Sequence, residues 1–219
     1  LTSADYKKVA NSGASIVWTP RHDISIYGDT VRVTVFKKYG GNIALGSYWR
    51  RTGSVNLLHE LKAADTFNTK NLCGFFKLKE LFEMATINGA KAMGVQSKIG
   101  CLKAGMLADF VVFRKNGKRG YTVPVRAQPA DVQAVFRSGT ILYGDSYLIK
   151  NLTGADTGYE TLSATGIEKR IYSTREIESS VTSDLSSYPL NISEKFDDIR
   201  TAIPSRSSGS SIYTGKPTA

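Results

Sequence analysis

Two kinds of hydrophobic pattern alternate along residues 1–97. Short apolar runs predict buried strands, and apolar residues at helical spacing, such as Val55, Leu58 and Leu61, predict helices. The expected elements are helices at 5–13, 29–39, 54–65 and 78–93, strands at 14–18 and 42–46, and a loop at 21–28. Asp29 is the expected N-cap of the second helix. Strands that alternate with helices in this way indicate parallel α/β structure.

The pattern changes after residue 97. A strand is expected at 108–113, and a hairpin formed by 132–136 and 140–143 is expected around Ser138-Gly139. From residue 173 the chain is rich in Ser and Thr, a composition typical of disordered segments. We expect that tail to dock on the body of this chain or on a partner. The predicted domains are 1–97 (α/β), 98–150 (a small β module) and 151–219 (an extended tail).

Composition places the chain among globular proteins, with 41% hydrophobic and 22% charged residues. No apolar run approaches the length of a membrane span, and the first residues do not form the pattern of a signal peptide. The net charge of +10 predicts a solvated basic surface, because the charges occur as scattered pairs. Nucleic-acid binding is the least favoured class, and the basic charge points weakly to an intracellular, mitochondrial location.

The two cysteines and two histidines restrict the chemistry. Cys73 and Cys101 match no metal or redox spacing, so each is predicted to be a small core residue. His59 lies beside Glu60 without a second histidine four residues on, which favours a structural or surface role. We predict no metal site and no cofactor from these residues.

Five segments in a fixed order carry a family resemblance. They lie at 40–46, 52–62, 84–94, 99–112 and 132–144. Together they resemble the C-terminal part of the amidohydrolase superfamily, in its imidazolonepropionase, dihydroorotase and cytosine-deaminase-like branches, over about residues 1–150. The resemblance implies an α/β fold: the C-terminal part of a (β/α)8 TIM-type barrel, then part of a small β-sandwich and an irregular Ser/Thr-rich tail.

The best-matched residues of these segments have structural roles. Gly100 and Gly105 are expected in tight turns, where glycine adopts positive φ angles. Asp109 is expected to accept hydrogen bonds from backbone donors at the start of a strand. Gly89 and Ala90 are expected to let a helix pack closely.

The family's metal site is expected to be degenerate in this chain. The resemblance implies histidine ligands, an acidic residue or modified lysine, and an aspartate that follows the eighth strand and takes a proton from the attacking water. Within 45–49, Tyr48 stands at the position of that aspartate, and a phenol with a pKa near ~10 is a poor base at neutral pH. The candidates for the mouth of the barrel are His22, Asp23, Tyr48 and Trp49.

Two functions remain open. The first is a non-catalytic structural or assembly subunit, whose half barrel needs a protein partner or its own N-terminal half and forms an oligomer or larger assembly. The alternative is part of a metal-dependent hydrolase, acting on C–N bonds of cyclic amides or amidines and completed by an N-terminal half or another chain. Zinc or a similar divalent metal is expected only in the second case.

Overall fold

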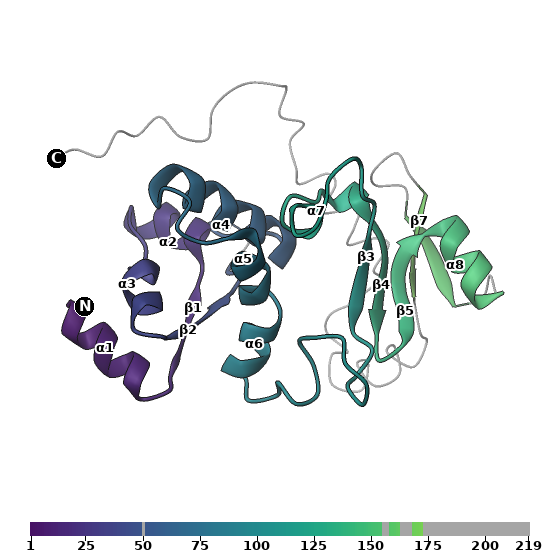
Figure 1. Ribbon diagram of the computed structural model, residues 1–219. Helices are drawn as coiled ribbons and strands as arrows, with labels where there is room; N and C mark the ends of the chain where they lie inside the picture. Colours follow the sequence, from purple (N-terminus) through teal and green to yellow (C-terminus); the bar gives the residue numbers. More distant parts are fainter. Residues whose placement is uncertain (50, 155–157, 163–167, 173–219) are drawn as a thin grey trace, which may run out of the picture. The chain divides into compact units, whose positions relative to one another are not determined.

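The computed structural model describes residues 1–49, 51–154, 158–162 and 168–172 (Figure 1). The described residues belong to one compact unit, Leu1–Ser173. The Ser/Thr-rich tail predicted from residue 173 lies outside them. In the part of the chain that is described, no helix is both long and apolar enough to cross a membrane.

Two short parallel strands form the centre of the α/β part. β1 (Ser15–Trp18) pairs with β2 (Asn42–Leu45). The connection between them contains α2 (Pro20–Tyr27) and α3 (Val33–Lys38), and α1 (Ser3–Asn11) precedes β1. Both predicted strands and the first predicted helix are confirmed. Because Trp18 pairs with Leu45, the residues that follow each strand leave from the same edge.

The connection between the two strands differs from the prediction. Residues 21–28 are not a loop, because Pro20 begins helix α2 and Gly28, at φ 68°, ends it by donating its N–H to the Ile24 carbonyl. Asp29 is not an N-cap, since α3 begins only at Val33. The Asp29 carboxylate instead accepts the N–H of the adjacent residue.

Three further helices follow β2. They are α4 (Leu57–Asn71), α5 (Leu78–Met84) and α6 (Ile87–Ala92). The helix predicted at 54–65 corresponds to α4, which begins three residues later and ends six residues later. Its N-cap is Asn56, whose side chain accepts from the His59 N–H at 2.9 Å. The single helix predicted at 78–93 is divided at Thr86, which has non-helical angles and whose hydroxyl donates to the Phe82 carbonyl at 2.9 Å.

The main hydrophobic core lies around the parallel strands. Trp18 is fully buried, and its ring contacts Phe67 edge-on at 6.0 Å and Phe76 at 6.2 Å between centroids. The other fully or nearly fully buried members include Val33, Phe36, Ile43, Leu81, Met84 and Val125. These residues come from the two parallel strands and from the helices that pack with them in one core.

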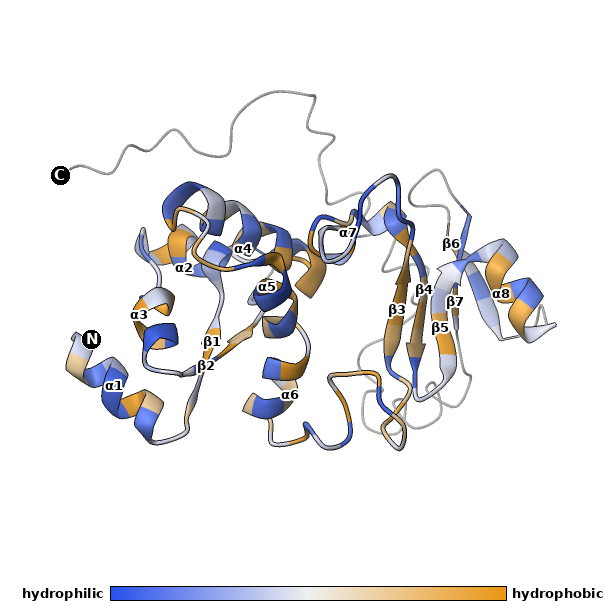
Figure 2. Cartoon of the chain, viewed as in Figure 1, coloured by the Kyte–Doolittle hydropathy of each residue, from blue (hydrophilic) through white to orange (hydrophobic). Residues whose placement is uncertain are grey.

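The second part is a single antiparallel sheet of five strands in the order β3-β4-β5-β7-β6, and Figure 2 shows the hydrophobic residues along β3 and β4. The strands are β3 (Phe110–Phe113), β4 (Val132–Arg137), β5 (Thr140–Asp145), β6 (Tyr159–Leu162) and β7 (Lys169–Tyr172). The predicted hairpin is confirmed, with Ser138 and Gly139 both at positive φ. A second sheet facing this one is not among the described residues, so the β-sandwich stays a prediction.

Several elements of this part were not predicted. They are α7 (Thr122–Val125), α8 (Ser146–Thr153), β6 and β7. The segment expected to be an extended tail from residue 151 therefore contains two strands of the sheet. These strands pair with each other, and β7 pairs with β5, which places buried charged residues inside the sheet.

The structural roles predicted for the motif residues are mostly confirmed. Gly100 and Gly105 have φ angles of 98° and 85°, and the Asp109 carboxylate accepts from the Ser138 N–H at 2.7 Å. The expectation for Gly89 is wrong, because a Cβ there would meet open space. The close approach occurs at Gly100, where a Cβ would lie 2.8 Å from the Ala90 Cβ.

The prediction that both cysteines lie in the core is wrong. Cys73 and Cys101 are exposed, and neither lies in a helix or strand. Cys73 has a φ of 51° in the turn after α4, and the Cys101 sulfur lies 3.4 Å from that of Met106. Hydrophobic character alone did not place these thiols, because turns at these positions keep their side chains at the surface.

Candidate functional site at the ends of the parallel strands

The carboxyl ends of β1 and β2 bring together two residues that lie far apart in the sequence. His22 comes from the first turn of α2, and Tyr48 comes from the segment that follows β2. Their ring centroids are 4.0 Å apart, with an angle of 36° between the planes. We call His22, Tyr48, Trp49 and Thr52 the strand-end face. In barrel enzymes, catalytic groups sit at this end of the strands.

Thr52 fixes the imidazole of His22. The His22 Nδ1 lies 2.7 Å from the Thr52 Oγ1, which in turn donates to the Trp49 carbonyl at 3.4 Å. Tyr27, at the end of α2, meets the His22 ring edge-on at 6.4 Å. Sequence reasoning missed Thr52 and Tyr27, because no motif spacing marks either residue.

The predicted candidate Asp23 has a different environment. Its two carboxylate oxygens accept hydrogen bonds from the hydroxyls of Thr19 and Thr30, each at 2.7 Å. The Thr30 hydroxyl also accepts the indole N–H of the buried Trp18 at 3.0 Å. Asp23 therefore links the start of α2 to the core, and each of its oxygens already accepts a hydrogen bond.

Trp49 and Tyr48 present their aromatic rings to solvent. Tyr48 is 59% exposed and Trp49 is 64% exposed. The guanidinium of Arg51 lies over the Trp49 ring, 5.9 Å from its centroid. Exposed rings of this kind can stack against a planar ligand.

A buried carboxylate lies next to the start of α2. Glu60, in α4, is fully buried and accepts the Arg21 N–H at 2.9 Å through Oε1. Its Oε2, like the hydroxyl of the buried Ser54, has no hydrogen-bond partner among the described residues. Neither residue was a sequence candidate, and the helical spacing of α4 gave no reason to expect a buried charge there.

The residues of the strand-end face do not fit a divalent metal. Within the described ranges there is no group of three or more His, Cys, Asp or Glu residues that could hold an ion. Both oxygens of Asp23 already accept hydrogen bonds, and Tyr48 stacks on His22. His59 lies in the first turn of α4, where its N–H donates to Asn56.

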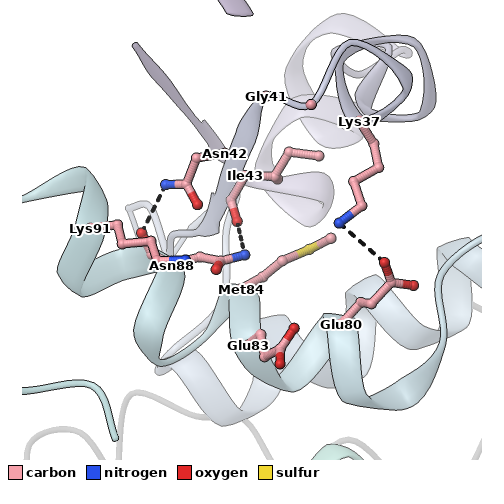
Figure 3. Close-up of a pocket in the computed structure, with 10 residues that line it drawn as sticks. Lys37, Gly41, Asn42, Ile43, Glu80, Glu83, Met84, Asn88 and Lys91 are labelled. Atoms are coloured by element: carbon pink, nitrogen blue, oxygen red, sulfur yellow. Dashed lines mark hydrogen bonds and ion pairs between the residues drawn. The ribbon is translucent and has the colours of Figure 1, made fainter. Parts of the chain in front are cut away.

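A pocket of about 280 Å³ lies at the start of β2, the opposite end of that strand (Figure 3). The Lys37 ammonium lies 3.1 Å from the Glu80 carboxylate, and Asn88 donates to the Ile43 carbonyl at 3.0 Å. Burial works against ionisation of Glu80, but the backbone N–H of Lys77 and the Lys37 ammonium outweigh it and lower its pKa. The paired charges point to a structural role for this pocket.

The comparisons with known sequences agree with the resemblance. Residues 41–143 match the amidohydrolase family. A 5-methylthioadenosine/S-adenosylhomocysteine deaminase from Teredinibacter turnerae is 33% identical over 120 residues, which cover 52% of this chain and 27% of the relative. A 5'-deoxyadenosine deaminase from Methanosarcina mazei is 26% identical over 157 residues, which cover 66% of this chain and 35% of that relative. The matched part thus spans about a third of these relatives.

Solved structures show the same fold. An adenosine deaminase from Xanthomonas campestris with bound zinc has a TM-score of 0.59 at 20% identity, over 64% of this chain and 34% of that one. The guanine deaminase of E. coli has a TM-score of 0.57 at 19% identity, over 66% of this chain and 37% of that one. The α/β part is accordingly a portion of a TIM-barrel-like fold. Residues 41–143 match the amidohydrolase family, and the chain carries part of the fold of the solved deaminases.

Proposed function

We propose that this chain is part of a hydrolase that acts on C–N bonds of cyclic amides or amidines. The observation that carries the proposal is the family match at 41–143, together with relatives that are deaminases. Deamination of a ring amidine is hydrolysis of a C–N bond. In this proposal an N-terminal half or another chain completes the barrel and supplies the rest of the site.

The strand-end face would contribute the contacts to the substrate. The exposed rings of Tyr48 and Trp49 offer flat apolar surfaces to a planar heterocycle. His22 adds a polar group beside them. Zinc or a similar divalent ion, if the complete enzyme uses one, would be held by residues outside the strand-end face, because that face does not supply a ligand set.

A second candidate function is that of a non-catalytic structural or assembly subunit. Tyr48 favours it, because a phenol stands where the family resemblance implies an aspartate. In the described residues, β1 and β2 pair only with each other, so each leaves one edge for a further strand. Both candidates therefore require a protein partner or an N-terminal half.

Release of ammonia tests the proposal. We expect the complete native protein, with any chain that accompanies these residues, to release ammonia from ring amidines such as adenosine or 5'-deoxyadenosine. The Trp49→Ala variant should raise KM about tenfold, since stacking of a base on an aromatic ring contributes ~1–3 kcal/mol. Steady-state kinetics with a coupled ammonia assay measures both quantities.

The matched control is Tyr147→Ala, which removes another exposed aromatic ring, one that lies on α8. We expect KM to stay unchanged in this variant. If the assembled, folded protein neither released ammonia from any ring amidine nor opened the ring of any cyclic amide, the hydrolase proposal would fail and the assembly role would be favoured.

A further inference from the structure

We infer that His22 is the proton acceptor of the strand-end face and that Thr52 holds it in the tautomer with its proton on Nδ1. The inference rests on the proposed function, because it names a group that moves the proton during hydrolysis. It starts from the 2.7 Å contact between the His22 Nδ1 and the Thr52 Oγ1.

The hydroxyl of Thr52 decides which imidazole nitrogen carries the proton. That hydroxyl has one hydrogen, and the Trp49 carbonyl, 3.4 Å from the hydroxyl oxygen, is an acceptor for it. With its hydrogen on that carbonyl, the hydroxyl oxygen accepts from the His22 Nδ1, which is the tautomer that we infer. A neutral imidazole with a proton on Nδ1 has a bare Nε2 that can accept one.

Aromatic neighbours hold the ring in place. Tyr48 lies against one face of the His22 ring at 4.0 Å, and Tyr27 meets it edge-on. Among the described residues, Nε2 has no hydrogen-bond partner in the structure. The imidazole is therefore fixed in orientation while its basic nitrogen stays available.

The chemistry of Tyr48 makes such a group necessary. A phenol is a poor proton acceptor at neutral pH, whereas a neutral imidazole is a competent one. Tyr48 cannot serve as the aspartate that the family resemblance implies at its position. His22, in contact with the Tyr48 ring, lies beside the same point in the fold.

The proton transfers balance for a ring amidine. Water attacks the amidine carbon while one of its protons moves to the His22 Nε2, and the electron pair of the C=N bond moves to the ring nitrogen. The resulting imidazolium then gives that proton to the amino group. The ring nitrogen re-forms the C=N bond as ammonia leaves with the electron pair of the C–N bond, and the hydroxyl product tautomerises to the amide. His22 ends in its starting state.

The tautomer can be measured without any assay of activity. Nitrogen-15 NMR of the complete native protein distinguishes protonated from bare imidazole nitrogens, and the signals that disappear in His22→Gln are those of His22. We expect a protonated Nδ1 and a bare Nε2 in the wild type, and a shift toward the other tautomer in Thr52→Val. The control is Thr66→Val, an exposed threonine of α4, which should leave the signals unchanged. A protonated Nε2 in the wild type would overturn the inference.

Kinetics separates failure of this inference from failure of the proposed function. For the complete native protein we expect His22→Gln to lower kcat by about 10²–10⁴-fold, the usual contribution of general base catalysis, with a small change in KM. Thr52→Val should lower kcat less, because it misplaces the base without removing it. An active wild type with an unchanged His22→Gln variant would overturn the inference alone. A wild type inactive on all ring amidines and cyclic amides would overturn the proposed function, and the proton-transfer role with it.

Discussion

Replacing Lys169 by alanine is expected to lower the free energy of unfolding by about 3–5 kcal/mol, the usual cost of breaking a buried ion pair. The Lys169 side chain is 1% exposed and its ammonium pairs with Asp145, which is fully buried. It also donates to the Val132 carbonyl at 2.6 Å. Arg114 also pairs with Asp145, at 2.9 Å, and the substitution keeps this partner, which favours the lower part of that range.

Chemical denaturation measures this effect, with Lys115→Ala as the matched control. Lys115 is exposed, and a surface substitution of this kind changes stability by about 0.5 kcal/mol or less. A Lys169→Met variant should lose nearly as much stability as Lys169→Ala, because methionine keeps the volume of the side chain but not its charge. In the double variant with Asp145→Asn the loss should be smaller than the sum of the two single losses. Equal stability of Lys169→Ala and Lys115→Ala would show that the pair does not stabilise the sheet.

The second large effect is expected for Trp18→Ala, at about 3–5 kcal/mol of lost stability. Trp18 is fully buried between the rings of Phe67 and Phe76. The substitution leaves a cavity beside the parallel strands. It also removes the indole N–H that the Thr30 hydroxyl accepts, and with it one link of the network that ends at Asp23.

Trp49→Ala is the control, because it removes the chain's other tryptophan from an exposed position. We expect its stability to change by about 0.5 kcal/mol or less. Thermal or chemical unfolding followed by circular dichroism compares the two variants without relying on tryptophan fluorescence. If Trp18→Ala unfolded as late as Trp49→Ala, the core described around β1 would be wrong.

The sequence predicted those elements whose signals are local. The strands β1 and β2 are apolar after their first residues, Ser15 and Asn42, and the hairpin turn carries Ser138-Gly139. Pro20 and Gly28 mark the start and the end of α2 in the structure, but the residues after Pro20 were predicted to form a loop. That helix is anchored through the side chain of Asp23, a contact that hydrophobic periodicity does not contain.

The five-stranded antiparallel sheet contains features that local sequence patterns do not predict. Lys169 and Arg170 lie in β7 and are buried, whereas charged residues are ordinarily read as exposed. Their burial depends on partners such as Asp145 in β5, more than twenty residues away. Pairing across a sheet compensates these charges, and the sequence of one strand does not reveal it.

Part of the candidate site was predicted and part was not. The structure places His22 and Tyr48 in contact and leaves Trp49 exposed nearby in the chain, whereas it gives Asp23 a structural role. Thr52 could not be predicted, because its contact with His22 joins residues 30 positions apart. Tyr48 became a candidate through the family resemblance, and the hydrophobic pattern of the sequence alone would not have identified it.

The zinc content of the complete native protein tests most directly whether the strand-end face holds a metal. We expect the wild type, His22→Gln and Tyr48→Phe to bind the same number of zinc ions per chain, because the described residues form no ligand group there. Circular dichroism of each variant establishes that it is folded before the metal is counted. Loss of zinc from a folded His22→Gln or Tyr48→Phe variant would contradict the assignment of this face to substrate contact and proton transfer without metal ligation.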